Sequence, residues 1–365
     1  MKKPELHQFL TGATDGDAIT GQALIFRRWL RELGFKSNIY AQFIHANIEA
    51  EVNHLSSFHK KMLGERVIYH HSIGSEMPAF LTREHVRMLL IYHNITPKEF
   101  FERSDPQRAE LARLGQEQLL GLSQITELAL AVSAYNERDL IAAGYTNTAV
   151  MPLALRTADY DLFSNEVLES QLQSTGTNIL FVGRLAPNKK QEDLIKLLYY
   201  FQRLDPQVHL YLVGDRWEIG YDRWVEDLAA ECNLEDSLTV TGKVSQSDLV
   251  TYYRNSTIYV SMSEHEGVGL PFIESMYFEL PIIAYGVAGV PDTIGDGGVL
   301  FYEKDYEGLA ELVHLLVNDQ AVQQRVIARQ KKQLQRFLEP RVRQQFCRYL
   351  QQLKFQLPAG VGKQA

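Results

Sequence analysis

Short apolar segments alternate with amphipathic segments along most of the chain, and this alternation is the feature that most restricts its fold. The apolar runs 178–182, 208–213 and 237–241 have the length of buried strands, and a stretch with helical periodicity follows each of them. Consecutive strands separated by helices pair in parallel, because a parallel connection needs a crossover long enough to hold a helix. The chain is therefore predicted to be an α/β protein with helices covering parallel sheets.

The alternation is interrupted once, and the interruption predicts the domain organisation. A length of 365 residues is enough for two domains. We predict an N-terminal domain at 1–155, a linker at 156–175 and a second domain at 176–338. Residues 339–365 are expected to form a last helix, which packs back on the N-terminal domain, and a tail. Each domain has the strand and helix order of a Rossmann-like half, and the two halves are expected to face each other across a cleft.

Charge and cysteine content exclude several classes of protein. The net charge of −8 argues against a nucleic-acid partner, and Cys232 and Cys347 lack the spacing of a zinc site or a disulfide framework. No apolar run reaches the length of a membrane span, and the N-terminus lacks a signal-peptide core, so we expect a cytoplasmic protein. A basic face formed by Arg27, Arg28 and Arg31 leaves two interpretations open. It is either a solvated surface or a peripheral contact with the inner face of the membrane.

In the first half, polar side chains follow the ends of predicted strands. Gly16 and Asp17 follow the first strand, His70 and His71 follow a later one, and His93 follows the next. Open parallel sheets bind ligands at the carboxyl ends of their strands. We interpret His93 as a residue that faces a ligand, and His70 and His71 as buried structural residues.

The stretch Ser261–Ser275 carries the strongest pattern in the second half. A strand-like segment ends there, a glycine-rich loop follows, and a helix begins near Pro271, where proline is favoured. Glu266 and Glu274 lie on either side of that turn. A helix N-terminus with accessible backbone amides is a site for anions, and carboxylates beside it can accept hydrogen bonds from sugar hydroxyl groups.

Two further loops complete a predicted ligand site in this half. One loop contains Arg184 and Lys189 and another contains Asp215, each directly after a predicted strand. Two cations, a helix N-terminus and two carboxylates suit a nucleoside diphosphate joined to a sugar. Arg184 and Lys189 would neutralise the diphosphate, Glu274 would hold the ribose and Glu266 the sugar. Asp215 either contacts this donor or caps a helix.

The second half resembles a known family of enzymes. Val-Gly-Arg-Leu-Ala-Pro-Asn-Lys at 182–189, Ser-Glu-His-Glu-Gly-Val-Gly-Leu-Pro-Phe-Ile-Glu-Ser-Met at 263–276 and Leu-Pro-Ile-Ile-Ala-Tyr-Gly-Val-Ala-Gly-Val-Pro at 280–291 resemble the retaining glycosyltransferases of family 4. These enzymes have the glycosyltransferase B fold, which consists of two Rossmann-like domains. The first half matches this family more loosely, and the combination of the two halves resembles bacterial enzymes, often mannosyltransferases, that extend lipopolysaccharide O-antigen or exopolysaccharide chains.

The resemblance implies a reaction and its partners. A hexose, expected to be mannose, would move from a nucleotide sugar, with GDP-mannose favoured, to a growing glycan or lipid-linked acceptor. The anomeric configuration would be retained, and neither a cofactor nor a metal ion would take part. The chain also contains two Asp-x-Asp triplets, at 15–17 and 159–161, a pattern that binds metal ions in another glycosyltransferase fold. We interpret both triplets as chance occurrences.

The resemblance also assigns roles to single positions. The residues expected at the reacting centre are His93, Arg184, Lys189 and Glu266. The residues expected to bind the donor are Gly16, Asp17, Arg184, Lys189, Asp215, Val244, Glu266, Gly267, Val268, Gly269, Leu270 and Glu274. The chain departs from the family pattern at Val268, where phenylalanine is commoner, and at Lys190, where glycine is usual.

Two other functions remain open from the sequence. A nucleotide-sugar epimerase or hydrolase could use the same fold, and a two-carboxylate hydrolase would use Glu266 as a nucleophile. A non-catalytic protein that binds sugar nucleotides is the other alternative. The presence of both predicted cations and both glutamates favours transfer over this last interpretation.

Overall fold

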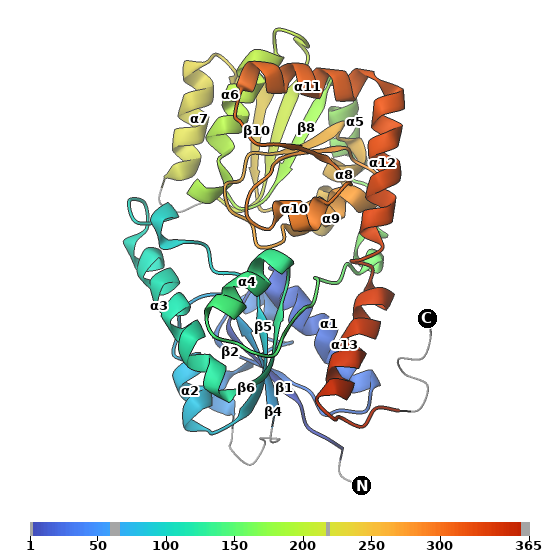
Figure 1. The fold of residues 1–365 in the computed structure, drawn as a ribbon. Helices are drawn as coiled ribbons and strands as arrows, with labels where there is room; N and C mark the ends of the chain where they lie inside the picture. The colour runs from blue at the N-terminus through green and yellow to red at the C-terminus, as the bar shows by residue number, and fades with distance from the viewer. Residues whose placement is uncertain (1–2, 59–65, 217–219, 359–365) are drawn as a thin grey trace. The chain divides into compact units, whose positions relative to one another are not determined.

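A computed structural model describes residues 3–58, 66–216 and 220–358 of the chain. Contacts divide the chain into two compact units (Figure 1). The first unit comprises 1–154 and 339–365, and the second comprises 155–338. The last helix of the chain therefore belongs to the first unit. The end of the predicted C-terminal tail, at 359–365, lies outside the described residues.

The first unit is built on a parallel sheet of seven strands in the order β3-β2-β1-β4-β5-β6-β7. Its strands are β1 (His7–Ala13), β2 (Ile39–Ile44), β3 (Asn53–His54), β4 (Arg66–His71), β5 (Arg87–Tyr92), β6 (Thr126–Ala131) and β7 (Thr148–Val150). Its helices are α1 (Ala18–Glu32), α2 (Met77–Arg83), α3 (Pro106–Leu122), α4 (Ala134–Ala142) and α13 (Glu339–Gln352). The strand order changes direction next to β1, and sheets of this kind bind ligands at their carboxyl edge.

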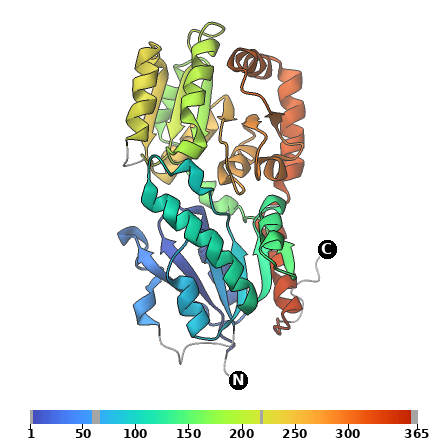
Figure 2. The same cartoon turned by 60° about the vertical axis from the view of Figure 1, so that its left-hand side comes forward.

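Helix α13 packs on α1 (Figure 1), and Figure 2 shows the first unit turned so that α3 lies in front of the sheet. The rings of Phe26 and Phe346 stack with centroids 4.5 Å apart. At the start of α13, the Glu339 carboxylate accepts hydrogen bonds from Arg28 Nη2 at 2.7 Å and Trp29 Nε1 at 2.9 Å. These contacts bury one face of α1, so α13 completes the core of the first unit.

The second unit contains a parallel sheet of six strands in the order β10-β9-β8-β11-β12-β13. Its strands are β8 (Asn178–Val182), β9 (His209–Val213), β10 (Leu238–Gly242), β11 (Ile258–Ser261), β12 (Ile282–Tyr285) and β13 (Val299–Phe301). Its helices are α5 (Glu166–Gln173), α6 (Gln191–Phe201), α7 (Tyr221–Glu231), α8 (Gln246–Asn255), α9 (Leu270–Tyr277), α10 (Val290–Ile294), α11 (Tyr306–Asn318) and α12 (Gln320–Leu334). The predicted fold class, two Rossmann-like parallel-sheet domains, is confirmed.

The stretch 156–175, predicted to be a linker, is structured and lies within the second unit. It contains a 3-10 turn and the helix α5, which Asn165 caps by accepting from the backbone amides of Val167 and Leu168. The backbone amide of Asn165 also donates to Thr251 Oγ1 on α8 at 2.8 Å. This element was hard to predict because α5 has only eight residues, and Thr251, which holds its N-terminal end, is 86 positions away in the sequence.

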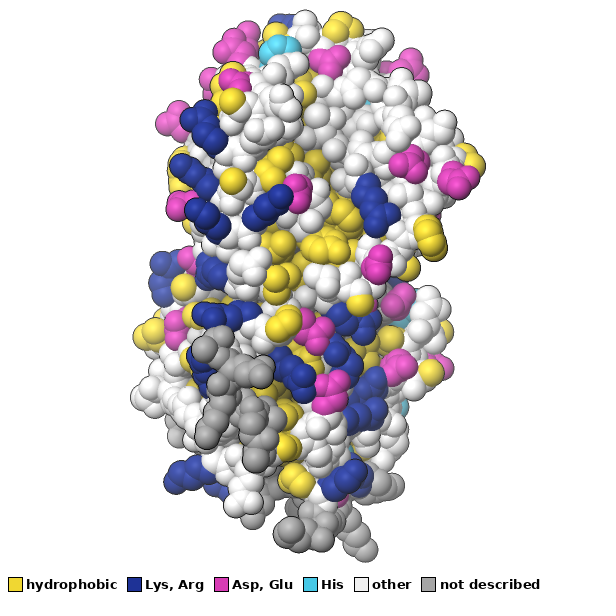
Figure 3. Space-filling model, turned by 90° about the vertical axis from the view of Figure 1, so that its right-hand side faces the viewer, with side chains coloured by type: hydrophobic (Ala, Val, Ile, Leu, Met, Phe, Trp, Pro, Cys, Tyr) yellow, Lys and Arg dark blue, Asp and Glu magenta, His cyan; other side chains and the backbone are white. Residues whose placement is uncertain are grey.

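The surface on the side of α12 and α13 carries charges of both signs. Figure 3 shows Lys and Arg side chains interspersed there with Asp and Glu, and hydrophobic side chains reach the surface between them. Among the described residues, no helix has both the length and the apolar character that a membrane crossing requires.

Candidate functional site

The β8–α6 loop of the second unit ends in a strained residue. After β8, residues Pro187–Lys189 form one 3-10 turn, and Lys190 then adopts a left-handed conformation with φ 55° and ψ 45°. A non-glycine residue in this region costs about 1 kcal/mol, which is why glycine is the usual choice. Helix α6 begins directly after this residue, at Gln191, and Lys190 is its N-cap.

The β11–α9 loop is shaped by two glycines. Gly269 has φ 75° and directly precedes α9, and a side chain there would meet the ring of Phe272 at 2.6 Å. Gly289, at the start of α10, donates its amide to the carbonyl of Glu266 at 2.9 Å. A Cβ atom on Gly289 would lie 2.1 Å from the carbonyl oxygen of Gly267. The loop that carries Glu266 therefore has room to pack on α10 only because glycine stands at 289.

A hydrogen bond from α10 also holds the β11–α9 loop in place. Thr293 Oγ1 on α10 donates to the carbonyl of Val268 at 2.7 Å, and this threonine is fully enclosed. Gly267, Val268, Gly269 and Leu270, which were predicted to bind the donor through their backbone amides, occupy the turn into α9. Amides at the start of a helix present donors to an anion.

The two loops meet at the carboxyl ends of the adjacent strands β8 and β11. Lys189 Nζ lies 2.6 Å from Glu266 Oε1, and both side chains are partly exposed. The side-chain amide of Asn188 donates to the carbonyl of His265 at 3.1 Å, and the backbone amide of Glu264 donates to the carbonyl of Asn188 at 2.9 Å. The structure thus brings together a cation and a carboxylate that were predicted to act on one ligand, although 77 positions separate them.

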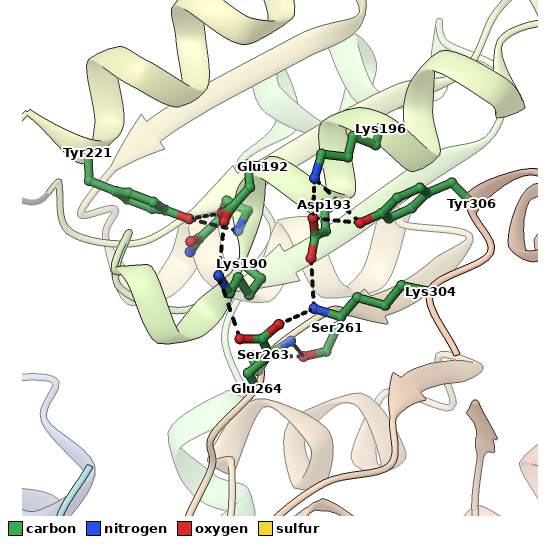
Figure 4. A network of polar contacts seen from close by, with 11 residues as sticks. Lys190, Glu192, Asp193, Lys196, Tyr221, Ser261, Ser263, Glu264, Lys304 and Tyr306 are labelled. Carbon is green, nitrogen blue, oxygen red and sulfur yellow. Dashed lines mark hydrogen bonds and ion pairs between the residues drawn. The ribbon is translucent and has the colours of Figure 1, made fainter. Parts of the chain in front are cut away.

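A network of further charges holds these loops to α6 and to the β13–α11 loop (Figure 4). Glu264 accepts from Lys304 Nζ at 2.8 Å and lies 3.5 Å from Lys190 Nζ. Lys304 also reaches Asp193 at 2.7 Å, at the start of α6. Lys190 lies 3.4 Å from Glu192, which accepts a hydrogen bond from the hydroxyl group of Tyr221.

Burial and ion pairing oppose each other in this network. Burial alone would raise the pKa of Asp193, but hydrogen bonds from Lys196, Lys304 and Tyr306 outweigh it and lower the pKa. Burial would lower the pKa of Lys190, yet the neighbouring carboxylates of Glu192 and Glu264 raise it. Asp193 and Lys190 are therefore both charged at neutral pH. The contact between Lys304 and Asp193 could not be predicted from the sequence, because 111 positions separate the two residues.

Glu274 has an environment different from the one predicted for it. Its side chain is 5% exposed, and its two carboxylate oxygens accept hydrogen bonds from Tyr160 and Tyr253, each at 2.6 Å. Burial raises the pKa of Glu274, and the two hydrogen bonds only partly oppose this effect. Each oxygen retains a second lone pair that a ribose hydroxyl could use. Tyr160 was missed because it lies in the stretch that was interpreted as a linker.

Arg184, Asp215 and Val244 lie in the three loops that follow β8, β9 and β10. Arg184 is exposed, and the backbone amide of the next residue, Leu185, donates to the carbonyl of Asp215 at 3.0 Å. A Cβ atom on Gly214 would lie 2.1 Å from the carbonyl oxygen of Gly183, so the first two loops approach closely. The carboxyl edge of this sheet therefore gathers the predicted residues of the second unit.

The predicted residues of the first unit lie at the carboxyl edge of their own sheet. Gly16 adopts φ 78° in the β1–α1 loop, and the Asp17 carboxylate caps α1 by accepting from the amide of Thr20 at 2.9 Å. His93 follows β5, and its Nε2 atom lies 2.8 Å from Nδ1 of His70. His70 was interpreted as a structural residue without a role at the site, yet the structure makes it the direct partner of His93.

The described ranges contain no group of three or more His, Cys, Asp or Glu side chains placed to hold a metal ion. The triplet at 15–17 includes the helix cap Asp17, and in the triplet at 159–161 Asp159 pairs with Arg156. These contacts account for Asp17 and Asp159 within ordinary local structure.

A comparison with protein families identifies the part of the chain that carries the site of the second unit. The family "Glycosyl transferases group 1" matches residues 165–333. This range includes Arg184, Lys189, Glu266 and Glu274.

Curated relatives cover similar parts of the chain. D-inositol 3-phosphate glycosyltransferase of Thermobifida fusca is 30% identical over 149 residues, which are 39% of this chain and 34% of that protein. Sulfoquinovosyl transferase SQD2 of Arabidopsis thaliana is 27% identical over 210 residues, or 54% of this chain and 39% of that protein. O-antigen chain mannosyltransferase B of Escherichia coli is 24% identical over 162 residues, which are 43% of this chain and 41% of that protein. The chain thus spans well under half the length of these relatives.

Solved structures resemble the chain over almost its whole length. Sucrose-phosphate synthase of Thermosynechococcus elongatus superposes with a TM-score of 0.75 at 17% identity, covering 96% of this chain and 99% of that one. HepE of Anabaena in complex with UDP-glucose superposes with a TM-score of 0.76 at 17% identity, covering 95% and 99%. The chain therefore has the glycosyltransferase B fold, and its residues 165–333 match the group 1 glycosyl transferases.

Proposed function

We propose that this protein is a retaining glycosyltransferase of family 4. It transfers a hexose, in the first instance mannose, from a nucleotide sugar to a glycan or lipid-linked acceptor of cell-surface polysaccharide. The observation that carries the proposal is the contact between Lys189 and Glu266 at the carboxyl edge of β8 and β11, inside the segment that matches the family.

The charges of the site suit departure of a nucleoside diphosphate. As the bond between sugar and phosphate breaks, negative charge develops on the diphosphate, and a positioned cation stabilises that charge. Lys189 supplies a point charge and Arg184 a planar fork of donors. We propose that these two cations take the role that a divalent metal ion has in other transferases, and that no cofactor is needed.

Glu266 and the amides of the β11–α9 loop complete the proposed donor site. Glu266 would accept hydrogen bonds from hydroxyl groups of the sugar, and the backbone amides at 267–270 would contact the sugar and the phosphate. The Glu266 carboxylate also holds Lys189 in place before the donor binds. In the proposed reaction the acceptor attacks on the face from which the diphosphate leaves. The leaving phosphate takes the acceptor proton, so that Glu266 need not act as a nucleophile.

The three relatives described above have names that refer to different sugars or acceptors. They therefore support the proposal of glycosyl transfer more than the choice of mannose as the sugar. Their names include an inositol phosphate glycosyltransferase, a sulfoquinovosyl transferase and an O-antigen mannosyltransferase. The choice of GDP-mannose as the donor is therefore a more specific proposal than glycosyl transfer itself. A lipid-linked acceptor would bring the first unit to the inner face of the membrane.

A binding screen followed by an assay of the products tests the function. Thermal shifts with GDP, UDP and ADP and their hexose derivatives identify the nucleotide, and we expect GDP-mannose to give the largest rise in melting temperature. Incubation with the best donor and a polyprenyl-diphosphate oligosaccharide should give an α-linked product by NMR. Release of free sugar at the same rate without any acceptor would instead support a hydrolase, and no shift with any nucleotide would contradict the proposal.

A further inference from the structure

Three side chains form a line of hydrogen bonds across neighbouring strands of the first unit. Gln8 on β1 accepts from His70 on β4, with 3.0 Å between Gln8 Oε1 and His70 Nε2. His70 Nδ1 lies 2.8 Å from Nε2 of His93, which follows β5. Gln8 and His70 are 0% and 1% exposed, so water does not provide alternative partners. We call Gln8, His70 and His93 the histidine relay.

The direction of every hydrogen bond in the relay follows from its first member. The side-chain nitrogen of Gln8 donates to the backbone carbonyl of Ala23 at 2.9 Å, and a carbonyl oxygen can only accept. This contact fixes the amide so that Oε1, and not the nitrogen, faces His70. His70 must therefore carry its proton on Nε2.

A neutral imidazole has one N–H group, so the remaining choices are fixed in turn. His70 Nδ1 lacks a proton and can only accept, and His93 must therefore donate from Nε2. The proton of His93 is committed to His70, and Nδ1 of His93 is left as an acceptor with a lone pair. His93 is partly exposed and directly follows β5, at the carboxyl edge of the sheet.

Both histidines of the relay are neutral at physiological pH. Burial is the chief cause, and it lowers the pKa of His70 well below its usual value and that of His93 to about 3. The ring centroids lie 5.1 Å apart with 19° between the ring planes, so a charge on one ring disfavours a charge on the other. The ring of Phe26 packs against His70 at 5.9 Å and excludes water from that side.

The neighbouring titratable groups do not break the relay. His71 points into separate contacts, with its Nε2 atom 2.9 Å from the carbonyl of Gly115 and its Nδ1 atom 3.1 Å from the Tyr69 hydroxyl. Burial lowers the pKa of His71 to about 4 and raises that of Tyr69 to about 12. Both groups are neutral between about pH 5 and pH 9.

We propose that Gln8 and His70 are positioning residues that hold His93 as its Nε2–H tautomer, so that His93 offers Nδ1 as an acceptor to a hydroxyl group of the ligand. That this hydroxyl belongs to a donor sugar rests on the function proposed above, whereas the tautomer follows from the relay alone. His93 would then accept a hydrogen bond from the sugar rather than donate one.

Long-range nitrogen–proton NMR spectra of protein labelled with ¹⁵N-histidine test the tautomer without any substrate. The His93→Gln variant assigns the His93 signals in the spectrum of the unaltered protein. We expect Nε2 of His93 to show the shift of a protonated nitrogen and Nδ1 that of an unprotonated one, unchanged between about pH 8 and pH 5. A protonated Nδ1, averaged shifts, or titration near pH 6.5 would overturn the proposal.

The Gln8→Leu variant tests whether Gln8 sets the direction of the hydrogen bonds in the histidine relay. It removes the acceptor that fixes His70, so the relay can run in reverse, and we expect a population of His93 with its proton on Nδ1. The matched control is Gln42→Leu, on β2 of the same sheet and outside the relay, which should leave the His93 signals unchanged. Unchanged His93 signals in a folded Gln8→Leu protein would contradict the role of Gln8.

Turnover separates positioning from a general loss of structure. In Gln8→Leu we expect kcat for transfer to fall about tenfold, the worth of one hydrogen bond, while the affinity for the nucleoside diphosphate stays unchanged. Full kcat in this variant, together with an altered tautomer, would show that the ligand does not use Nδ1. If the unaltered protein binds no nucleotide sugar, the proposed function fails but the tautomer result stands.

Discussion

In the second unit, ion pairs join the loops at the carboxyl edge of the sheet, whereas in the first unit the corresponding edge is joined by neutral hydrogen bonds between buried groups. Lys189 pairs with Glu266, and Lys190 and Lys304 pair with Glu264. The histidine relay of the first unit contains no charge at neutral pH. Charged, partly exposed groups can exchange their partners for a charged ligand, while buried neutral groups fix the direction of single hydrogen bonds.

The difference explains which residues could be found from the sequence. A cation and a carboxylate in glycine-rich loops form a pattern that stands out along the chain. A buried glutamine beside a histidine does not, because the same residues also occur as ordinary core residues. The predictions below test whether the two edges differ in the way described.

The largest effect is expected at the ion-paired edge, from Glu266→Gln. This change removes the charge that holds Lys189 and the acceptor proposed for the sugar, and we expect kcat/KM for transfer to fall about 100-fold or more. Steady-state kinetics with the donor identified by the thermal-shift screen measure it. Glu231→Gln, on the exposed surface of α7, is the matched control and should retain full activity. Equal activity in both variants would rule out a role for Glu266.

The next effect concerns the backbone that supports Glu266. In Gly289→Ala the new Cβ would lie 2.1 Å from the Gly267 carbonyl, so the loop must move. We expect the free energy of unfolding to fall by about 2 kcal/mol or more, and transfer to be lost with it. Urea unfolding measures the change.

Gly121→Ala on α3 is the matched glycine control for this prediction. A side chain there would meet nothing within 4 Å, and alanine favours a helix, so stability should stay unchanged or rise by up to about 1 kcal/mol. If Gly289→Ala were as stable as Gly121→Ala, the close approach of α10 to the loop would be wrong.

Lowering the pH should reduce the stability of the first unit, because its buried histidines are held neutral. The pKa values of His71 and His93 are lowered by burial to about 4 and about 3, so the unfolded chain binds more protons than the folded one as the pH falls below about 6.5. We expect the free energy of unfolding to fall by about 1–2 kcal/mol per histidine between pH 6.5 and pH 5.

Chemical unfolding at a series of pH values measures this dependence. His71→Gln should reduce the slope, because one depressed group is then absent. A slope equal to that of the unaltered protein would mean that His71 is not held neutral. Asn47→Gln, at an exposed position without a titratable group, is the control and should leave the slope unchanged.

The smallest effect is expected from Lys190. In Lys190→Gly the left-handed backbone is relieved by about 1 kcal/mol, while two partly exposed ion pairs worth up to about 1 kcal/mol each are lost. We expect the free energy of unfolding to change by less than about 1 kcal/mol. Lys190→Met loses the same pairs without the relief and should be the less stable of the two variants. The reverse order would contradict the strain assigned to Lys190.

The fold could be predicted from the sequence to a large extent, because it depends on local patterns. Apolar runs predicted the strands, and the glycines with Pro271 predicted the turn into α9. Long-range contacts could not be predicted in this way. Lys304 follows β13 and contacts Asp193 and Glu264, which lie 111 and 40 positions away in the sequence.

Two residues show how a local interpretation misleads. Tyr160 lies in a stretch without strand and helix alternation, and this feature concealed both the 3-10 turn and the hydrogen bond to Glu274. His70 has the surroundings of a core histidine, and only the position of Gln8 beside it reveals its part in the relay. In both cases the partner is more than 60 positions away, where no periodicity extends.

Titration calorimetry with GDP-mannose measures the central claim, that Lys189 and Glu266 form a site for a nucleotide sugar, most directly. The unaltered protein is expected to bind, and Lys189→Met is expected to weaken binding about tenfold or more, since a cation facing the diphosphate is lost. Lys332→Met, on the exposed surface of α12, should bind as the unaltered protein does. If Lys189→Met bound the nucleotide sugar as tightly as Lys332→Met, the site would not be where this account places it.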